Sequence, residues 1–335
     1  MQALITGISG EVGHGLIKKL HSQGYKVIAA DIKEPEAEIS EFIHKFYTCD
    51  ISDKSLVDKI FEEQNFDIIF HLASILSTGG EKNPELAAKV NIGGTLNLLE
   101  AATAQGLENK KAIKFIFPSS IAAYGIPSLE EKAKTKKIKE DQFTNPTTIY
   151  GVSKLACENL GNYFSKNYKL LGEIDRNNLI DFRCVRFPGL LSPDTVPSGG
   201  TSDYGPEMVH AAAQGKNYEC FVREGSTIPF MAMADAAEVL TQLADAPKEN
   251  LKRFVYNVQG FSVSAGQIYD MAKRFFPDFE MTYKINNERQ AIVDSWPEDV
   301  DDTSAQKDWG WQPKYSFEKT FSEYLIPKIK ERYNS

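Results

Sequence analysis

The sequence predicts an α/β fold in which helices cover both faces of a doubly wound parallel sheet and a smaller C-terminal lobe follows. Two observations carry this prediction. Through residue 185, short apolar stretches alternate with amphipathic helical segments, which is the pattern of parallel β-α-β units. From Arg186 onwards prolines and glycines become dense and the alternation ends. We therefore expect the sheet first and a lobe of different character after it.

Each expected strand is a short apolar run, and each expected helix has an apolar face. The strands are expected at residues 2–6, 26–30, 68–70 and 114–117, and the helices at 11–23, 83–105 and 150–168. In the first helix Val12, Leu16 and Leu20 share one face. The turn-forming residues between 186 and 206 predict a long loop, which in a compact domain is usually functional. More helices should follow, the last over 317–330.

Composition and charge narrow the class of protein. Of the 335 residues 42% are hydrophobic and 25% are charged, as in ordinary globular proteins, and a net charge of −8 argues against nucleic acid as a partner. No signal peptide is recognisable, and no run of about 18 apolar residues predicts a membrane span. The four cysteines lack CxxC spacing and the five histidines form no HxxxH pattern. We expect a cytoplasmic protein with reduced thiols, no membrane contact and no metal site.

A glycine-rich turn joins the first expected strand to the first helix. It reads Thr6-Gly7-Ile8-Ser9-Gly10-Glu11-Val12-Gly13. Glycines at this spacing allow a tight turn, the approach of backbone amides to a pyrophosphate, and close packing of helix on strand. The helix N-terminus adds partial positive charge toward the phosphates. The sequence therefore predicts a Rossmann-type, NAD-binding domain over residues 1–185. Residues 186–335 should form mainly a substrate-binding lobe, with some segments returning to the first domain.

Asp31 ends the second expected strand, where a carboxylate accepts hydrogen bonds from the adenosine ribose. The same charge repels the extra phosphate of NADP, so we expect NAD; the alternative is an aspartate that only caps a turn. Asp50 and Ile51 should flank the adenine, and the segment after His71 should pass near the middle of the cofactor. The expected cofactor-binding residues are Gly7, Ser9, Gly10, Glu11, Val12, Gly13, Asp31, Ile32, Asp50, Ile51, Leu72, Ala73, Ser74, Asn91, Tyr150, Lys154 and Pro188.

Tyr150 and Lys154 form a YxxxK pattern on an expected helix, so the phenol and the ammonium share one face. At about 4 Å and an effective dielectric of about 20, their attraction is roughly 4 kcal/mol in favour of the phenolate. That attraction would bring a tyrosine pKa of about 10 toward neutrality, where a general base works best. Such a pattern is common by chance, and the alternative is two solvated helix residues. The glycine turn upstream favours the catalytic interpretation.

A serine-containing segment, Phe117-Pro118-Ser119-Ser120-Ile121-Ala122-Ala123-Tyr124-Gly125, follows another buried strand. Active sites of α/β proteins lie at the carboxyl ends of strands, so a hydroxyl here can hold a substrate oxygen against Tyr150. The alternative is a strand-terminal turn with no role in chemistry.

The glycine turn, the serine segment and the Tyr150/Lys154 pair together resemble the extended short-chain dehydrogenase/reductase superfamily of NDP-sugar epimerases, dehydratases and some dehydrogenases. The resemblance implies an NAD-dependent enzyme in which Ser120, Tyr150 and Lys154 are catalytic. Dehydratases of this superfamily usually carry an Asp-Glu pair after the catalytic hydroxyl. Ile121 and Ala122 stand there instead, which disfavours dehydration.

A narrower resemblance covers nearly the whole chain. The segments that carry it are 186–191, 199–204, 217–221, 289–292, 294–297 and 308–311. They are similar to the epimerase-like L-threonine 3-dehydrogenases, which implies oxidation of the threonine 3-hydroxyl by NAD to 2-amino-3-ketobutyrate, and a homodimer. Ser202 departs from the family's usual threonine, and residues 231–236 lack its usual tyrosine and proline. The segments 128–142 and 171–180 are longer than usual.

The resemblance also implies roles for individual side chains. Tyr150 as phenolate removes the hydroxyl proton, Ser120 orients that oxygen, and Lys154 holds the phenolate and the nicotinamide ribose. The residues expected to contact the hydroxy amino acid are Ser77, Ser120, Tyr150, Thr201, Ser202 and Trp296. Plain turn serines and a core tryptophan are the alternatives for Ser77, Ser202 and Trp296. For the whole chain, the alternatives are an NDP-sugar 4-epimerase, a dehydrogenase of another small hydroxy acid, and a non-catalytic NAD-sensing protein.

Overall fold

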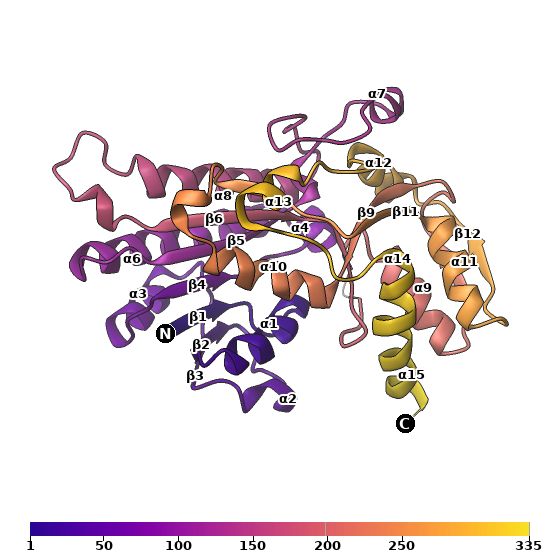
Figure 1. Ribbon diagram of the computed structural model, residues 1–335, viewed down its shortest axis with the longest axis horizontal. Coiled ribbons are helices and arrows are strands. Elements are labelled where there is room, and N and C mark those ends of the chain that lie inside the picture. The colour runs from indigo at the N-terminus through magenta and orange to yellow at the C-terminus, as the bar shows by residue number, and fades with distance from the viewer. Residues whose placement is uncertain (198, 335) are drawn as a thin grey trace.

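A seven-stranded sheet forms the centre of the molecule (Figure 1) in a computed structural model that describes residues 1–197 and 199–334. Its strands are β1 (Gln2–Thr6), β2 (Lys26–Asp31), β3 (Lys45–Thr48), β4 (Ile68–His71), β5 (Lys114–Ser120), β6 (Asp181–Phe187) and β10 (Val255–Asn257). The order is β10-β6-β5-β4-β1-β2-β3, with every neighbouring pair parallel. Because the order reverses between β1 and β4, a crevice opens beyond their carboxyl ends. The predicted α/β fold with a parallel sheet is confirmed.

Helices cover both faces of this sheet, because its strands are apolar on both sides. On one face α1 (Glu11–Ser22) packs against α10 (Met233–Asp245); on the other lie α3 (Lys54–Glu63), α6 (Thr95–Glu108) and α8 (Ile149–Lys166). Successive side chains of β1 point to opposite faces of the sheet. Ile5 is buried in the core beneath α1 and α10, and Leu4 is buried in the core beneath α3, α6 and α8.

The segment expected as one helix over 83–105 is divided. It consists of α5 (Pro84–Ala88), the π-helical turn η1 (Lys89–Gly94) and then α6. The wider turn brings Asn91 against the chain after β4, where its side chain accepts from the Ile75 amide at 2.7 Å and donates to the Ile75 carbonyl at 3.0 Å. It also seats Gly94 against Ile51, where a Cβ would lie 2.6 Å from the isoleucine side chain. The prediction of an unbroken helix is therefore wrong here.

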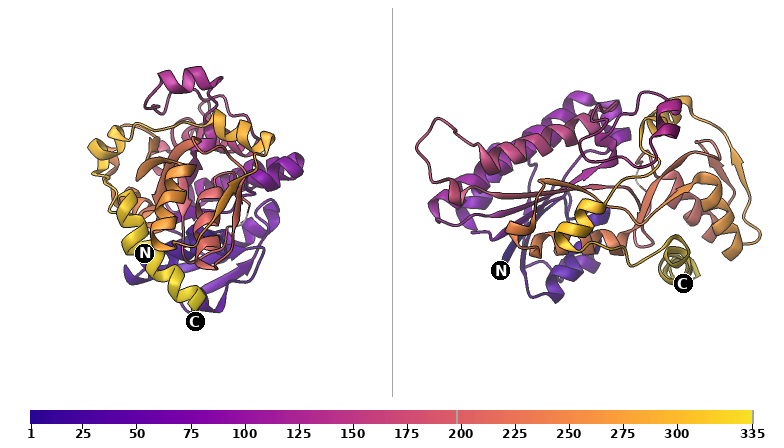
Figure 2. Two further views of the ribbon diagram at one scale, coloured as in Figure 1. Left: turned by 90° about the vertical axis from the view of Figure 1, so that its right-hand side faces the viewer. Right: turned by 45° about the horizontal axis from the view of Figure 1, so that its top comes forward.

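The C-terminal part builds a lobe beside the end of the sheet (Figure 2). Its strands are β7 (Gly189–Leu191), β8 (Tyr218–Cys220), β9 (Thr227–Ala232), β11 (Phe261–Ser264) and β12 (Met281–Tyr283). Its helical segments are α9 (Tyr204–Ala213), α11 (Ala265–Phe275), α12 (Asn287–Ser295), α14 (Phe317–Lys319), η5 (Thr320–Leu325) and α15 (Ile326–Asn334), whereas α13 (Thr303–Trp309) packs against β10 of the central sheet. The expected helix over 317–330 is thus also interrupted by a π-helical turn.

The region expected as a loop between 186 and 206 contains a strand. β7 pairs in parallel with β9, forming a three-stranded sheet in the order β11-β9-β7. Gly189 permits this approach, since a Cβ there would lie 2.6 Å from the Phe230 ring. The loop proper is therefore shorter than expected and ends where α9 begins. In the part of the chain that the structure describes, no helix is long and apolar enough to cross a membrane.

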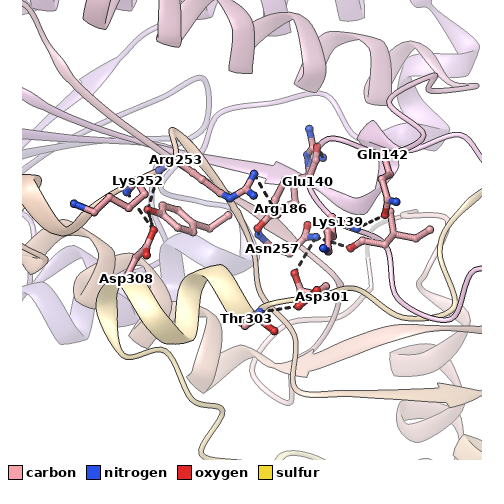
Figure 3. A network of polar contacts seen from close by, with 12 residues as sticks. Lys139, Glu140, Gln142, Arg186, Lys252, Arg253, Asn257, Asp301, Thr303 and Asp308 are labelled. Carbon is pink, nitrogen blue, oxygen red and sulfur yellow. Dashed lines mark hydrogen bonds and ion pairs between the residues drawn. The ribbon is translucent and has the colours of Figure 1, made fainter.

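Short segments complete the chain: α2 (Ala37–Ser40), α4 (Ser77–Lys82), η2 (Ile121–Ala123), α7 (Leu129–Lys134), η3 (Arg176–Asn178) and η4 (Lys248–Asn250). The chain between α7 and α8 is fastened to the sheet by polar contacts (Figure 3). Arg186 donates to the Glu140 carbonyl at 2.7 Å, and the Glu140 carboxylate accepts from the Asn257 amide at 3.2 Å. Arg253 lies 3.7 Å from the same carboxylate. These contacts tie the segment to β6 and β10.

Candidate active site

A cavity of about 260 Å³ opens at the carboxyl ends of the central strands, between the sheet and the lobe. Its lining joins the glycine turn, the serine segment, the start of α8 and the loop before α9. The expected site residues on its wall are Gly7, Gly10, Glu11, Val12, Gly13, Leu72, Ser74, Ser77, Ser120, Tyr150, Lys154, Pro188, Thr201, Ser202 and Trp296. Sequence reasoning did not assign Leu76, Pro118, Ser119, Ile121, Phe187, Gly189, Leu190, Gly200 and Asp203, which also line it.

Two glycines of the glycine turn, Gly7 and Gly13, leave no room for a side chain of their own. Gly7 has a φ of +74°, and a Cβ there would lie 2.4 Å from the Ala73 nitrogen. At Gly13 a Cβ would lie 2.2 Å from the Ile8 carbonyl oxygen. The turn is thus a bare backbone cradle at the N-terminus of α1, which fits the pyrophosphate of a dinucleotide.

Asp31 is held beside this cradle at the end of β2. One carboxylate oxygen accepts from the Ser9 amide at 2.9 Å and the other from the Lys33 amide at 3.1 Å. Asp50 and Ile51 follow the adjacent strand β3, and Ile32 is exposed. The expected cofactor residues that are not on the cavity wall are Ser9, Asp31, Ile32, Asp50, Ile51, Ala73 and Asn91. The structure places Ala73 behind Gly7, and Asn91 behind the chain that follows β4.

Tyr150 and Lys154 lie on the first turns of α8, which begins where the Thr148 hydroxyl accepts from the Gly151 amide at 3.1 Å. Gly151 lets the helix lie close to the serine segment, because a Cβ there would be 2.0 Å from the Ala122 carbonyl oxygen. The Lys154 ammonium donates to the Pro118 carbonyl at 2.7 Å and lies 5.6 Å from the centre of the Tyr150 ring. The catalytic candidates therefore meet at one end of the cavity.

The pKa values of this pair depart from the sequence-based expectation. Burial raises the pKa of Tyr150 to about 12, and only a hydrogen bond with Ser120 acts in the opposite direction. Burial lowers the pKa of Lys154 to about 8. The expected shift of the Tyr150 pKa toward neutrality is therefore wrong for this arrangement, because desolvation of the phenol dominates and the ammonium is engaged with the Pro118 carbonyl.

A buried ion pair that sequence reasoning missed braces the site from behind. Arg186 on β6 donates to both carboxylate oxygens of Glu158, at 2.8 and 2.6 Å, and Ser119 donates to the same carboxylate. Both side chains of the pair are nearly fully buried. Glu158 is four residues after Lys154, so the face of α8 that carries the catalytic pair also carries the brace. That spacing was the available signal.

Elsewhere on the cavity wall the loop before α9 meets α4. The Ser77 and Thr201 hydroxyls lie 2.9 Å apart, and the Thr201 amide donates to Ser77 at 3.2 Å. Arg289 donates to the Gly200 carbonyl at 2.8 Å, which holds the loop from α12. Trp296 also lines the cavity; it is 4% exposed, and its indole nitrogen is buried without a hydrogen-bond partner among the described residues.

Known proteins resemble this chain over nearly its full length. Residues 3–258 match the sequence model of the NAD dependent epimerase/dehydratase family. A mitochondrial L-threonine 3-dehydrogenase of Sus scrofa is 34% identical over 327 residues, which are 97% of this chain and 82% of that protein. An uncharacterised epimerase/dehydratase of Staphylococcus aureus is 34% identical over 334 residues, 98% of this chain and 97% of that one.

A solved structure is similarly close. It is a monomeric L-threonine 3-dehydrogenase from a metagenome database, in its apo form, with 36% identity, 99% of each chain covered and a TM-score of 0.85. The resemblance to L-threonine 3-dehydrogenases that the sequence motifs indicate is therefore confirmed. The family model covers most of the chain and includes the glycine turn, the serine segment and the Tyr150/Lys154 pair. The protein belongs to the NAD dependent epimerase/dehydratase family, whose members use an NAD(P) cofactor.

Proposed function

We propose that this enzyme oxidises L-threonine at its 3-hydroxyl to 2-amino-3-ketobutyrate, with NAD as the hydride acceptor. One observation carries the proposal: a single small cavity has the glycine cradle on one wall, the Ser120, Tyr150 and Lys154 side chains on another, and small hydroxyl groups elsewhere on its wall. The names of the relatives indicate L-threonine as the substrate, and the small hydroxyl groups on the cavity wall support this choice.

NAD fits the cofactor site better than NADP. The Asp31 carboxylate, fixed by two backbone amides, stands where the adenosine ribose is expected and would repel a 2′-phosphate. The amides of the glycine turn and the N-terminus of α1 would hold the pyrophosphate. When bound, NAD supplies the acceptor for the hydride and a positively charged ring.

The side chains of this protein would manage the proton. Ser120 would donate a hydrogen bond to the oxygen of the substrate 3-hydroxyl. The proton of that hydroxyl would pass to the Tyr150 oxygen while a hydride leaves the carbon that bears the hydroxyl. Lys154, fixed by the Pro118 carbonyl, would stabilise the phenolate through space. Because burial raises the pKa of Tyr150, the reaction should run faster as pH rises and more phenolate forms.

The amino acid's charged end would bind between α4 and the loop before α9. Ser77, Thr201 and Ser202 bring hydroxyl groups to the cavity wall, and the Trp296 indole N–H is unpaired within the described part of the chain. Hydroxyls, backbone amides and an indole N–H can hold a carboxylate without an arginine. We propose these four side chains as substrate contacts.

An NDP-sugar 4-epimerase on the same scaffold is the main alternative. A nucleotide-sugar brings its own diphosphate, which cationic side chains usually neutralise. Among the described residues on the cavity wall the only lysine or arginine is Lys154, and it is already bound to a carbonyl. The cavity therefore favours a small zwitterion. A homodimer, which the narrower resemblance to L-threonine 3-dehydrogenases implies, stays a proposal; the relative from the metagenome database is described as monomeric.

A substrate panel tests the proposed function. The purified protein is incubated with NAD and, in separate reactions, L-threonine, L-serine, a small hydroxy acid without an amino group, and UDP-galactose. NADH is followed by absorbance, and UDP-sugars are resolved by chromatography. We expect NADH from L-threonine at the highest rate and unchanged UDP-galactose. Interconversion of UDP-sugars without NADH from any amino acid would overturn the proposal.

A further inference from the structure

A glutamate stands in the glycine turn, on the wall of the cavity. Glu11 is the first residue of α1 and lies between Gly10 and Gly13, which form the cradle. Across the cleft, the loop before α9 brings Asp203 to the same cavity wall. Two carboxyl groups therefore face each other where the cofactor cradle meets the substrate loop.

The two carboxyl groups differ in their hydrogen bonds. One Asp203 oxygen accepts from the Gly199 and Gly200 amides at 2.8 and 2.6 Å. Among the described residues no backbone amide is bonded to the Glu11 side chain. Burial of Glu11, followed by the Asp203 charge, raises the pKa of Glu11 to about 7. Near neutral pH, Glu11 therefore retains a proton that an ordinary glutamate would have lost.

We propose that binding of the dinucleotide is coupled to a proton on the Glu11 side chain. The inference rests on the proposed cofactor site and assigns the side chain a role that the glycine pattern does not. The pyrophosphate would bring negative charge to the wall that Glu11 shares. A neutral Glu11 tolerates that charge, whereas an ionised Glu11 repels it. Binding therefore raises the Glu11 pKa further, and the complex takes up a proton.

The sign of the pH dependence follows from this linkage. Below the pKa of the free protein, Glu11 already carries its proton, so affinity does not change with pH. Above it, a proton must be added with NAD, and affinity falls by about tenfold per pH unit as long as the pH stays below the Glu11 pKa in the complex. From a pKa of about 7, the loss reaches about 100-fold at pH 9.

Other charged groups surround the pair and must be separated from it. On the shared cavity wall the other titratable side chains are Tyr150 and Lys154, and Asp31 and Lys33 lie at the end of β2 next to Ser9 of the same turn. Lys154 matters most, because its lowered pKa of about 8 also predicts weaker anion binding as pH rises. The test therefore compares variants that all retain Lys154.

The experiment is calorimetric titration of the purified protein with NAD at pH 6, 7, 8 and 9, at constant ionic strength and in buffers of different ionisation enthalpy. Glu11→Gln keeps the shape of the protonated side chain and cannot ionise. We expect equal affinity of Glu11→Gln and the unaltered protein at pH 6, and about 100-fold tighter binding by Glu11→Gln at pH 9. At pH 8 the unaltered protein should take up nearly one proton more per NAD than the variant.

Two further variants sharpen the result. Glu38→Gln removes an exposed carboxylate beside α1 and should leave the pH dependence unchanged. Asp203→Asn removes the facing charge while keeping an oxygen for the loop amides, so the fall in affinity should begin at lower pH. Parallel affinity curves for Glu11→Gln and the unaltered protein would overturn the proton coupling alone. No NAD binding at any pH, in any of these proteins, would overturn the proposed cofactor site as well.

Discussion

Tyr150, the proposed general base, lies in the cavity, and burial raises its pKa to about 12, which favours the protonated phenol near neutral pH. Two neighbouring groups affect the phenol differently. A hydrogen bond with Ser120 lowers the Tyr150 pKa, while the Lys154 ammonium is held by the Pro118 carbonyl and lies 5.6 Å from the centre of the Tyr150 ring. Burial shifts both pKa values toward the neutral forms, although Lys154, with a pKa of about 8, is still largely charged at pH 7. Catalysis at this residue should therefore depend strongly on pH.

Replacing Tyr150 by phenylalanine tests the role of the phenol. We expect Tyr150→Phe to bind NAD normally and to lose at least about 100-fold in turnover with L-threonine, the lower end for removing a general base. In the unaltered enzyme at saturating NAD, kcat/KM for L-threonine should rise from pH 6 to pH 8, since the phenolate fraction increases while Lys154 largely keeps its charge up to its pKa of about 8; in the variant this rise should vanish. Steady-state kinetics across pH measure both effects. A variant with near-normal turnover would show that Tyr150 is not the base.

We propose that Asp31 determines the preference for NAD over NADP. Its carboxylate is anchored by the Ser9 and Lys33 amides, so its charge cannot swing away from a 2′-phosphate. Asp31→Ser should narrow the preference for NAD over NADP by weakening NAD binding and relieving the repulsion of NADP. Initial rates at matched, low cofactor concentrations give the ratio. Equal rates with the two cofactors before any substitution would contradict the assignment.

At the scale of elements, α8 is the part that assembles the site. It carries Tyr150 and Lys154 near its start and Glu158 one turn later, and Glu158 joins it to β5 through Ser119 and to β6 through Arg186. The brace lies behind the cavity and is dry. A buried pair of this kind is costly to break, because the remaining partner is left as an uncompensated charge.

Breaking this brace should destabilise the fold. For Glu158→Gln we expect the free energy of unfolding to fall by about 3–5 kcal/mol, because the buried Arg186 loses its counter-charge. Urea denaturation followed by circular dichroism measures the change. The matched control is Glu130→Gln, which removes a partner of Lys134 in an exposed pair and should cost at most about 0.5 kcal/mol. Similar losses in the two variants would contradict the structural role of the brace.

For the whole molecule, the sequence predicts the sheet well because strands buried on both faces are plain apolar runs. It does not predict β7, because those three residues become a strand only by pairing with the distant β9. The π-helical turn η1 is too short for its pattern of apolar residues to differ from that of an α-helix, so the sequence does not reveal it. The Glu158–Arg186 brace requires the knowledge that β5, β6 and α8 are neighbours. The direction of the Tyr150 pKa shift depends on how deeply the side chain is buried, and no local sequence pattern indicates that.

The two parts of the molecule share one core. A continuous cluster of buried apolar residues runs from Ile5 and Leu240 on the α1/α10 side of the sheet to Phe230 and Val263 in the lobe. We therefore expect one cooperative unfolding transition. Tryptophan fluorescence reports on the surroundings of Trp296, Trp309 and Trp311, of which Trp309 packs against Tyr256 of β10, whereas far-ultraviolet circular dichroism reports on the whole chain. Coincident urea midpoints from the two probes are expected, and separate midpoints would show two independently folding domains.

The central claim is that a hydride leaves the carbon bearing the threonine 3-hydroxyl and arrives on the cofactor, while Tyr150 receives the proton. The most direct measurement uses L-threonine deuterated at that carbon, with NAD, and mass spectrometry of the reduced cofactor. We predict deuterium in essentially every NADH molecule formed, at a rate lower than with unlabelled substrate, and no reduced cofactor with Tyr150→Phe above about a hundredth of that rate. Reduced cofactor without deuterium, or none from threonine at all, would contradict the account.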